Sequence, residues 1–203
     1  MTARLVLVRH GESVANVEQV LDTRPPGARL TEEGVRQASR LADALAAEPL
    51  AAVYASRAVR ARQTAAPVAQ RHELAVDVLD GVHESFAGAV EGRSDLEAHE
   101  AFRDVYRAWH TGDLDRCVPG GETGRQVLDR FLADLATVSK VHPTGTVVIV
   151  SHGAAMRLAA AALASNVDSA FADAHFMPNA GSVLLERSGN GWRCVRWNDV
   201  DLP

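Results

Sequence analysis

The sequence predicts an α/β domain in which helices cover both faces of a largely parallel sheet. Short runs that are apolar throughout alternate with longer segments of helical period, and strands that are apolar on both faces are typical of parallel sheets. The 203 residues, 47% of them hydrophobic, are enough to bury a substantial core. This length favours a single domain that spans residues 1–203.

The predicted strands come from the short apolar runs. Four of these runs have the length of buried strands, and two more are weaker candidates. The strong runs are 5–8, 50–54, 146–150 and 182–185, and the weaker ones are 74–79 and 192–197.

The predicted helices come from segments that repeat apolar residues every three or four positions. Residues 30–48 form such a segment, with Thr31 as the N-cap and two glutamates in the first turn. Residues 124–140 follow the same period. Residues 153–164 predict a tightly packed, alanine-rich helix that follows a strand.

Residues 93–120 differ from the rest of the chain because they are charged and lie between two glycine-containing motifs. Phe102, Tyr106 and Trp109 occur there at spacings of four and three, so we expect a short helical excursion over one edge of the sheet. We interpret these aromatic side chains as the packing face of that helix rather than as a surface on which a substrate stacks.

Composition limits the partners and the compartment. A net charge of −5 and a pI near 5.9 argue against a general nucleic-acid binder, which needs a basic surface. Cys117 and Cys194 are too few for a disulfide framework, which favours a reducing compartment. The N-terminal apolar run is too short for a secretion signal, and no run approaches the ~18 apolar residues of a membrane span. We expect a cytoplasmic protein, monomer or homodimer, with no membrane or nucleic-acid partner.

Two segments of the same form end in a histidine and a glycine. Residues 5–11 are LVLVRHG and residues 147–153 are VVIVSHG, each an apolar strand followed by a polar residue. Ligands of parallel α/β sheets bind beyond the carboxyl ends of the strands. We therefore expect His10 and His152 to open onto the same crevice, where Arg9 supplies a cation and each glycine permits a sharp turn.

A third predicted strand ends at Ser56 and is followed by Arg57, Arg60 and Arg62. Three cations in six positions are a poor pattern for an ordinary helix, but they can place at least one guanidinium in the same crevice. Guanidinium groups bind phosphate oxygens bidentately, and a charge-assisted hydrogen bond contributes roughly 1.5 to 3 kcal/mol. Arginines and histidines at one sheet edge thus indicate a phosphoryl group as the ligand, held without a metal.

These residue types also indicate a reaction. A neutral imidazole can attack phosphorus and divide the displacement into two steps through a phosphohistidine. The leaving alkoxide then needs a proton, which a nearby carboxylic acid can give. Glu84 is the candidate because it follows a predicted strand and lies between Gly81 and Gly88. Taken alone, Glu84 fits a surface carboxylate better.

In these residues the chain resembles the histidine phosphatase superfamily, the phosphoglycerate mutase-like proteins. The RHG motif with a later SHG is highly specific, whereas the other motifs would be weak separately. The motifs span nearly the whole chain in the family's order: LVRHGES with Asn16 behind it, LTEEGVRQA, S-x-x-x-R-A-x-Q-T from Ser56, E-x-x-x-G-x-x-E-G from Glu84, PGGET and VVIVSHG. The resemblance implies a three-layer α/β/α sandwich with a mostly parallel central sheet.

The resemblance also implies roles, residue by residue. His10 falls on the nucleophile that becomes phosphorylated, and Glu84 falls on the proton donor. Arg60 is chosen over its neighbours because the family's arginine directly precedes A-x-Q-T. The residues implied to bind the phosphoryl group are Arg9, Asn16, Arg60 and His152.

Two departures from the family's pattern concern the mouth of the site. Ala87 and Val90 stand where relatives often have larger or acidic residues, so the wall beside the proton donor is smaller or differently packed. Arg29 stands where an aspartate is common. With Arg24, it either adds cationic contacts for a substrate with a second acidic group or lies in solvent.

We expect a metal-independent phosphomonoesterase that hydrolyses a small phosphorylated metabolite through a phosphohistidine, with no cofactor and with the 93–120 excursion over its active site. The alternative is a cofactor-dependent phosphoglycerate mutase that uses the same catalytic residues. The chain ends soon after its last predicted strand, which favours hydrolysis because water can enter.

Two other classes of protein are less favoured. A metal hydrolase with His10, His152 and Glu84 as ligands is disfavoured because the adjacent arginines would repel a divalent cation. A catalytically silent binder of phosphorylated ligands would be expected to lack His10, Arg60 or Glu84, and none of these is replaced.

Overall fold

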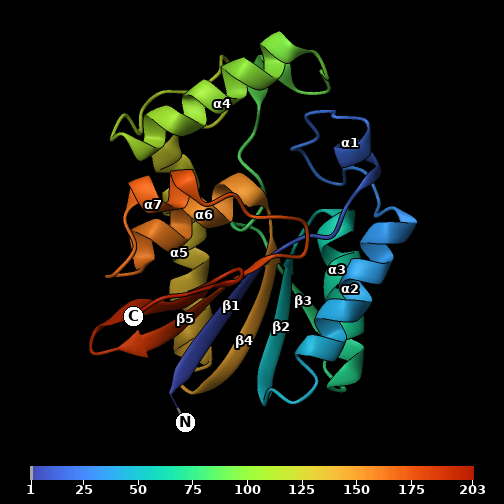
Figure 1. Ribbon diagram of the computed structural model, residues 1–203, viewed down its shortest axis with the longest axis vertical. Helices are drawn as coiled ribbons and strands as arrows, with labels where there is room; N and C mark the ends of the chain where they lie inside the picture. Colours follow the sequence, from blue (N-terminus) through green and yellow to red (C-terminus); the bar gives the residue numbers. More distant parts are fainter. Residues whose placement is uncertain (1) are drawn as a thin grey trace.

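The computed structural model describes residues 2–203, which form a seven-stranded sheet in the order β3-β2-β4-β1-β5-β6-β7 (Figure 1). The strands β3, β2, β4 and β1 are parallel to one another. The strands β5, β6 and β7 are antiparallel to their neighbours, and short turns join them, as antiparallel pairing allows. The strands are β1 (Ala3–Arg9), β2 (Leu50–Ser56), β3 (Val76–Leu79), β4 (Gly145–Ser151), β5 (Ser182–Ser188), β6 (Gly191–Trp197) and β7 (Val200–Asp201).

The described residues also form seven α-helices and one short 3-10 helix. The three helices predicted from periodicity are confirmed as α2, α5 and α6, and the Thr31 side chain caps α2 by accepting a hydrogen bond from Gly34 N at 3.0 Å. The helices are α1 (Val14–Val17), α2 (Glu32–Ala44), α3 (Val59–Arg71), η1 (Gly88–Val90), α4 (Leu96–His110), α5 (Gly124–Val141), α6 (Gly153–Leu163) and α7 (Ser169–Ala174).

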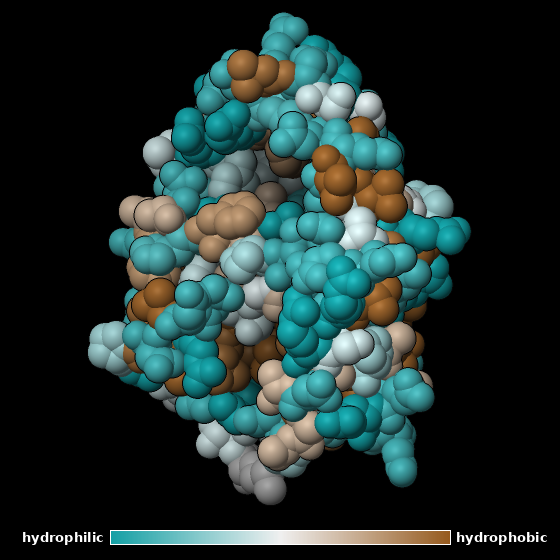
Figure 2. All heavy atoms as spheres, turned by 45° about the vertical axis from the view of Figure 1, so that its right-hand side comes forward, coloured by the Kyte–Doolittle hydropathy of each residue, from teal (hydrophilic) through white to brown (hydrophobic). Residues whose placement is uncertain are grey.

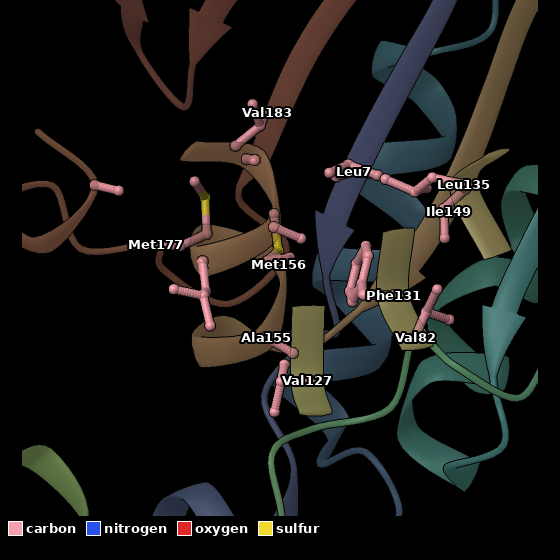
Figure 3. Packing of buried hydrophobic residues seen from close by; sticks show 14 of the residues in the cluster. Leu7, Val82, Val127, Phe131, Leu135, Ile149, Ala155, Met156, Met177 and Val183 are labelled. Carbon is pink, nitrogen blue, oxygen red and sulfur yellow. The ribbon is translucent and has the colours of Figure 1, made fainter. Parts of the chain in front are cut away.

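Helices cover both faces of the sheet, which confirms the predicted three-layer α/β/α sandwich. In Figure 1, α2 and α3 lie on one side of the parallel strands, and α5 and α6 lie on the other, with α4 and α7 beyond them. The alternation of side chains along β1 divides the core in two, because Leu5 and Leu7 belong to one buried cluster and Val6 and Val8 to the other. In the larger cluster, Phe131 of α5 packs beside β1 and β4 (Figure 3).

The arginine-rich segment after β2 is a regular helix, which corrects the expectation that its pattern suits a helix poorly. The helix α3 begins at Val59 and presents its arginines in different directions. The Arg60 side chain is 3% exposed, whereas Arg57 forms an exposed ion pair with Asp80 and Arg62 lies in solvent. Residues two positions apart on a helix point to nearly opposite sides, so one arginine faces inward while its neighbour faces water.

The 93–120 excursion contains α4, which packs against α6 and α7. Tyr106 and Trp109 are buried in the larger core cluster, as a packing face requires, while Phe102 is only partly buried. Among residues 2–203, no helix has both the length and the apolar character that crossing a membrane requires.

Candidate active site

Strand register brings the two motif histidines together. In the parallel pair β1 and β4, Arg9 lies opposite Ser151, so His10 and His152 leave the sheet side by side. The backbone N–H of His10 donates to the Ser151 carbonyl at 3.0 Å. The two rings are 5.1 Å apart between centroids and inclined by 61°, and both side chains are buried.

The hydrogen bonds of His10 define its tautomer. Its Nδ1 lies 2.7 Å from the carbonyl oxygen of Gly11, which can only accept, so Nδ1 carries the proton. Its Nε2 therefore holds the lone pair and accepts from Nε of Arg60 at 3.1 Å. Burial, followed by the charges of Arg60 and Arg9, holds the pKa of His10 well below its ordinary value of 6.5. The ring is neutral, with its unprotonated nitrogen facing a guanidinium.

His152 carries its proton on the other ring nitrogen, Nε2. Nη2 of Arg60 donates to Nδ1 of His152 at 3.2 Å, which leaves the proton on Nε2 for the Ser56 hydroxyl at 2.6 Å. Ser56 can reach the ring because β2 ends beside β4. Burial, followed by the charge of Arg60, also keeps the pKa of His152 well below 6.5.

The two arginines of the pocket differ in their protein partners. Arg60 forms a partly buried ion pair with Asp22, 3.0 Å from Nη1 to Oδ2, and also donates to the Asp22 carbonyl at 2.8 Å. Arg9 donates from Nη1 to the Met177 carbonyl at 2.7 Å, but its buried Nε has no partner within residues 2–203. Burial lowers the pKa of both arginines, and a buried donor without a partner is an unusual feature that needs an explanation such as a ligand.

Glu84 lies at the N-terminus of α6, where it accepts hydrogen bonds from Ala154 N at 3.1 Å and Ala155 N at 2.9 Å. The first N–H groups of a helix have no partners within the helix, and α6 has no side-chain cap of its own. Arg130 of α5 holds the loop, because it donates to the carbonyls of His83 and Glu84 at 2.8 and 3.1 Å.

Asn16 connects the first turn after β1 with the loop before β5. Its Oδ1 accepts from Ser13 N at 3.0 Å and from Nδ2 of Asn179 at 3.1 Å. Asn179 Nδ2 also donates to the His10 carbonyl at 3.1 Å.

Five of the six predicted site residues line one cavity of about 120 Å³: Arg9, His10, Asn16, Arg60 and Glu84. The sixth, His152, is 1% exposed and contacts Arg60 instead of the cavity.

Close backbone packing holds the turn that follows His10. A Cβ on Gly11 would lie 2.7 Å from the Gly34 carbonyl oxygen, and a Cβ on Gly34 would overlap the Glu12 carbonyl. The Gly11 N–H donates to Oγ1 of Thr64 at 2.9 Å. The LTEEG and Q-T motifs therefore belong to the site because they support the turn that carries the nucleophile candidate.

Several residues that build the pocket were not predicted from the sequence. Asp22, Ser56, Arg130 and Asn179 hold the histidines, Arg60 and the Glu84 loop, and only Ser56 stands in a recognised motif. Glu122, in the PGGET motif, accepts from Arg130 Nε at 2.8 Å and from Phe86 N at 3.0 Å, which explains why that motif accompanies the Glu84 loop.

Of the two alternatives for Arg24 and Arg29, the structure favours solvent, because neither side chain lines the cavity. Arg24 is exposed and lies over the ring of Phe86, 4.6 Å from its centroid, and Arg29 is exposed.

Across residues 2–203, no group of three or more histidine, cysteine, aspartate or glutamate side chains is placed to hold a metal ion. Arg60 donates to ring nitrogens of both His10 and His152, where a metal would have to bind.

Fold and pocket together define a class of protein: an α/β/α sandwich whose buried histidines and arginines converge at the carboxyl ends of parallel strands. Comparison with known proteins then gives the family. Residues 5–200 match the model of the histidine phosphatase superfamily (branch 1), and the chain belongs to this family.

Named relatives and solved structures agree with this membership. A metal-independent phosphoserine phosphatase of Arabidopsis thaliana is 30% identical over 200 residues, which cover 97% of this chain and 81% of that protein. An adenosylcobalamin/alpha-ribazole phosphatase of Salmonella typhimurium is 33% identical, and the match covers 79% of each protein. A mycobacterial glucosyl-3-phosphoglycerate phosphatase has a structure with a TM-score of 0.84 at 26% identity, covering 98% of this chain and 100% of that chain.

The chain spans between a third and a half of the length of some curated relatives. It covers 36% of a PE-PGRS family protein of Mycobacterium tuberculosis, to which it is 30% identical. It covers 50% of an uncharacterized protein of the same organism, to which it is 46% identical over 103 residues.

Proposed function

We propose that this chain is a phosphomonoesterase that hydrolyses a small phosphorylated metabolite without a metal, through a phosphohistidine on His10. The observation that carries the proposal is the orientation of the His10 ring, whose Nε2 lone pair faces the Arg60 guanidinium while Nδ1 is held by a backbone carbonyl. A lone pair aimed into a cationic pocket is placed to meet the phosphorus of a bound phosphomonoester. We infer that residues 1–203 act as one catalytic domain.

Arg9 and Arg60 bind the phosphoryl oxygens in this proposal. Guanidinium groups suit this task because their donors match phosphate oxygens in pairs, and the unpaired Nε of Arg9 is available for one of them. Asn16, in the cavity wall, adds an amide contact. His152 is coupled to the same anion through Arg60, whose Nη2 donates to its Nδ1 at 3.2 Å.

In the first step Nε2 of His10 forms a bond to phosphorus while the bond from phosphorus to the alcohol oxygen breaks. The proton for that oxygen comes from the Glu84 carboxyl group. Glu84 lines both the phosphoryl cavity and the adjoining larger cavity, so it stands between the phosphorus and the space left for the alcohol. A negative phosphoryl group favours the protonated form of a carboxyl group beside it.

In the second step the Glu84 carboxylate takes a proton from a water molecule, whose oxygen attacks phosphorus. The bond between phosphorus and Nε2 breaks, its electron pair returns to the ring, and inorganic phosphate leaves. The Nδ1 proton stays on His10 throughout because the Gly11 carbonyl holds it. The residues thus return to their starting protonation states.

Trapping the phosphoenzyme tests this proposal. After a brief exposure to a phosphate-labelled aryl phosphate and an alkaline quench, the wild-type protein should carry a label that acid removes, as expected of a phosphohistidine. His10→Ala should lose label and turnover together, while His72→Ala, altered at the end of α3 outside the pocket, should keep both. Turnover by His10→Ala would overturn the proposal, and so would activity that a chelator abolishes and a divalent metal restores.

A mutase with the same residues is the alternative, and a direct assay separates the two. The protein is mixed with 3-phosphoglycerate and 2,3-bisphosphoglycerate, and both isomerised product and free phosphate are measured. Release of phosphate without isomerisation supports the hydrolase. Rapid isomerisation without phosphate release would replace the hydrolase by the mutase.

A further inference from the structure

The phosphoryl cavity adjoins a larger chamber beneath α4. The chamber has a volume of about 450 Å³, within the range of small-molecule sites, and it shares Arg9, Glu84 and Phe102 with the phosphoryl cavity. Figure 2 shows the molecule hollowed on this side, with hydrophilic residues above the hollow and hydrophobic residues beside it. Glu84 lines both spaces, so the proposed function places the alcohol of a bound phosphomonoester in the chamber.

The chamber is cationic although the chain as a whole carries a net charge of −5. Asp173 and Glu84 are its acidic residues, and Glu84 is held by backbone N–H groups of α6. Four arginines line it: Arg9, Arg103, Arg107 and Arg157. An excess of guanidinium groups around a space of this size favours an anion inside it.

Arg103 and Arg107 carry this excess. They stand four residues apart on α4, a spacing at which like charges destabilise a helix, and within residues 2–203 neither has an ion-pair partner. Two exposed arginines elsewhere do have acidic partners, because Arg93 pairs with Asp95 and Glu97 and Arg125 pairs with Asp115, whereas Arg62 lies in solvent. Arg157 already has a hydrogen-bond partner in the protein, because its Nε donates to the Ala172 carbonyl at 3.0 Å. The two α4 guanidinium groups are therefore free to bind a ligand.

Tyr106 gives an independent sign that the chamber is built for a polar ligand. Its side chain is 7% exposed and lines the chamber, yet its hydroxyl has no hydrogen-bond partner in the described chain. Burial raises the pKa of this hydroxyl, so it remains a donor at neutral pH. Buried polar atoms nearly always have a partner, and a ligand oxygen in the chamber would supply one.

We propose that the chamber selects phosphomonoesters whose alcohol carries a second anionic group, such as a carboxylate, and that Arg103 and Arg107 determine this specificity. The proposal rests on the proposed function, because it places the phosphoryl group in the smaller cavity. The Tyr106 hydroxyl donates to an oxygen of the same alcohol. Phe102 and Met177, also in the chamber wall, contact its carbon skeleton.

Matched substrates test the proposal. 3-Phosphoglycerate and glycerol 3-phosphate differ by a carboxylate in place of a hydroxymethyl group, and O-phosphoserine differs from O-phosphoethanolamine by a carboxylate. The wild-type protein should show a kcat/KM at least about tenfold higher for the acidic member of each pair, as a charge-assisted hydrogen bond predicts. Because both arginines are exposed, this preference should decrease as the salt concentration rises.

Variants assign the preference to the residues. Arg103→Gln and Arg107→Gln should each lower the ratio of kcat/KM values about threefold, and the double variant should bring it close to one. Arg62→Gln, which removes an exposed arginine of α3, should leave the ratio unchanged. Tyr106→Phe should raise KM for the acidic substrate without lowering the free energy of unfolding, because the lost hydroxyl has no partner in the free protein.

A simple aryl phosphate separates failure of this proposal from failure of the proposed function. If the wild-type protein hydrolyses p-nitrophenyl phosphate but shows no preference within either pair, the specificity proposal is wrong and the phosphatase assignment stands. A preference that survives in the double variant would also overturn it. If p-nitrophenyl phosphate is not hydrolysed either, the phosphatase assignment itself is wrong.

Discussion

Replacing Asp22 with asparagine isolates one electrostatic contact of the phosphoryl cavity. The Asp22 carboxylate lies 3.0 Å from Nη1 of Arg60, whose side chain is 3% exposed, so it is the anion that compensates this buried cation in the free protein. Asparagine keeps the shape and removes the charge. Two hydrogen bonds to Oδ2, from Arg60 and from Ala28 N at 2.7 Å, lose their charge assistance, at about 1 kcal/mol each.

The free energy of unfolding of Asp22→Asn should therefore fall by about 2 kcal/mol, which lowers the melting temperature of a chain of this size by about 4 to 8 °C. Inorganic phosphate should reduce this deficit, because the bound dianion replaces the missing negative charge beside Arg60. Any ligand at a hundred times its dissociation constant stabilises the folded state by about 2.7 kcal/mol. The informative quantity is therefore the difference between wild type and variant, measured by thermal unfolding with and without saturating phosphate.

The exposed pair of Arg57 and Asp80 provides the control. Solvent screens this pair, so Asp80→Asn should change the melting temperature little, and phosphate should stabilise it as it stabilises the wild type. If phosphate raises the melting temperatures of the wild type and Asp22→Asn by the same amount, the dianion does not compensate Arg60, and the reasoning is refuted.

Three further predictions concern the same site. Glu84→Gln should slow hydrolysis of alkyl phosphates about 100- to 10,000-fold but that of p-nitrophenyl phosphate far less, because only a poor leaving group needs the proton; equal losses would exclude Glu84 as the acid. His10 and His152 have pKa values well below 6.5, so below pH 6.5 the unfolded chain binds protons that the folded chain does not, and stability falls as the pH falls. Each histidine makes the free energy of unfolding fall by up to about 1.4 kcal/mol for each pH unit below 6.5. Denaturant unfolding of His10→Gln between pH 6.5 and 5 should therefore show a pH dependence that is smaller by one such contribution. Above pH 7, the free energy of unfolding should depend on pH in the variant as it does in the wild type. Gly34→Ala should lower the melting temperature although alanine favours helices, because the added Cβ would overlap the backbone of Glu12. Val35→Ala, on the exposed side of the same helix, should not lower it. A higher melting temperature for Gly34→Ala would show that the turn after β1 can move.

Hydrophobic periodicity predicted the helices and strands in which the apolar residues of the sequence pattern are also the residues buried in the fold. The runs that became β1 and β4 are apolar on both faces, and the RHG and SHG motifs at their ends marked the pocket because a strand end fixes where its next residue lies. The helix α3 was not predicted because its arginines obscured a buried face of small residues that includes Ala61, Ala65 and Val68. A helix packed through alanine leaves a weak hydrophobic signal.

The residues that hold the catalytic candidates in place had almost no signal in the sequence. Asn179 bonds to Asn16 across 163 positions, and Arg130 bonds to the Glu84 carbonyl across 46. Both are polar residues of ordinary composition, and no local spacing relates them to their partners. Only the folded chain shows that the strand ends, the loop before β5 and the side of α5 meet at one point.

The placement of α4 has a consequence for how such a protein can diversify. This helix rests on α6, α7 and the short turn η1, whereas the side chains proposed to bind the phosphoryl group come from the ends of β1 and β4, from α3 and from the turn after β1. In the proposed function, one wall of the alcohol chamber therefore comes from a segment separate from the side chains proposed to bind the phosphoryl group. If the proposed function holds, we expect exchange of residues 93–120 between family members to change which metabolite is accepted while the proposed phosphoryl-binding residues stay the same.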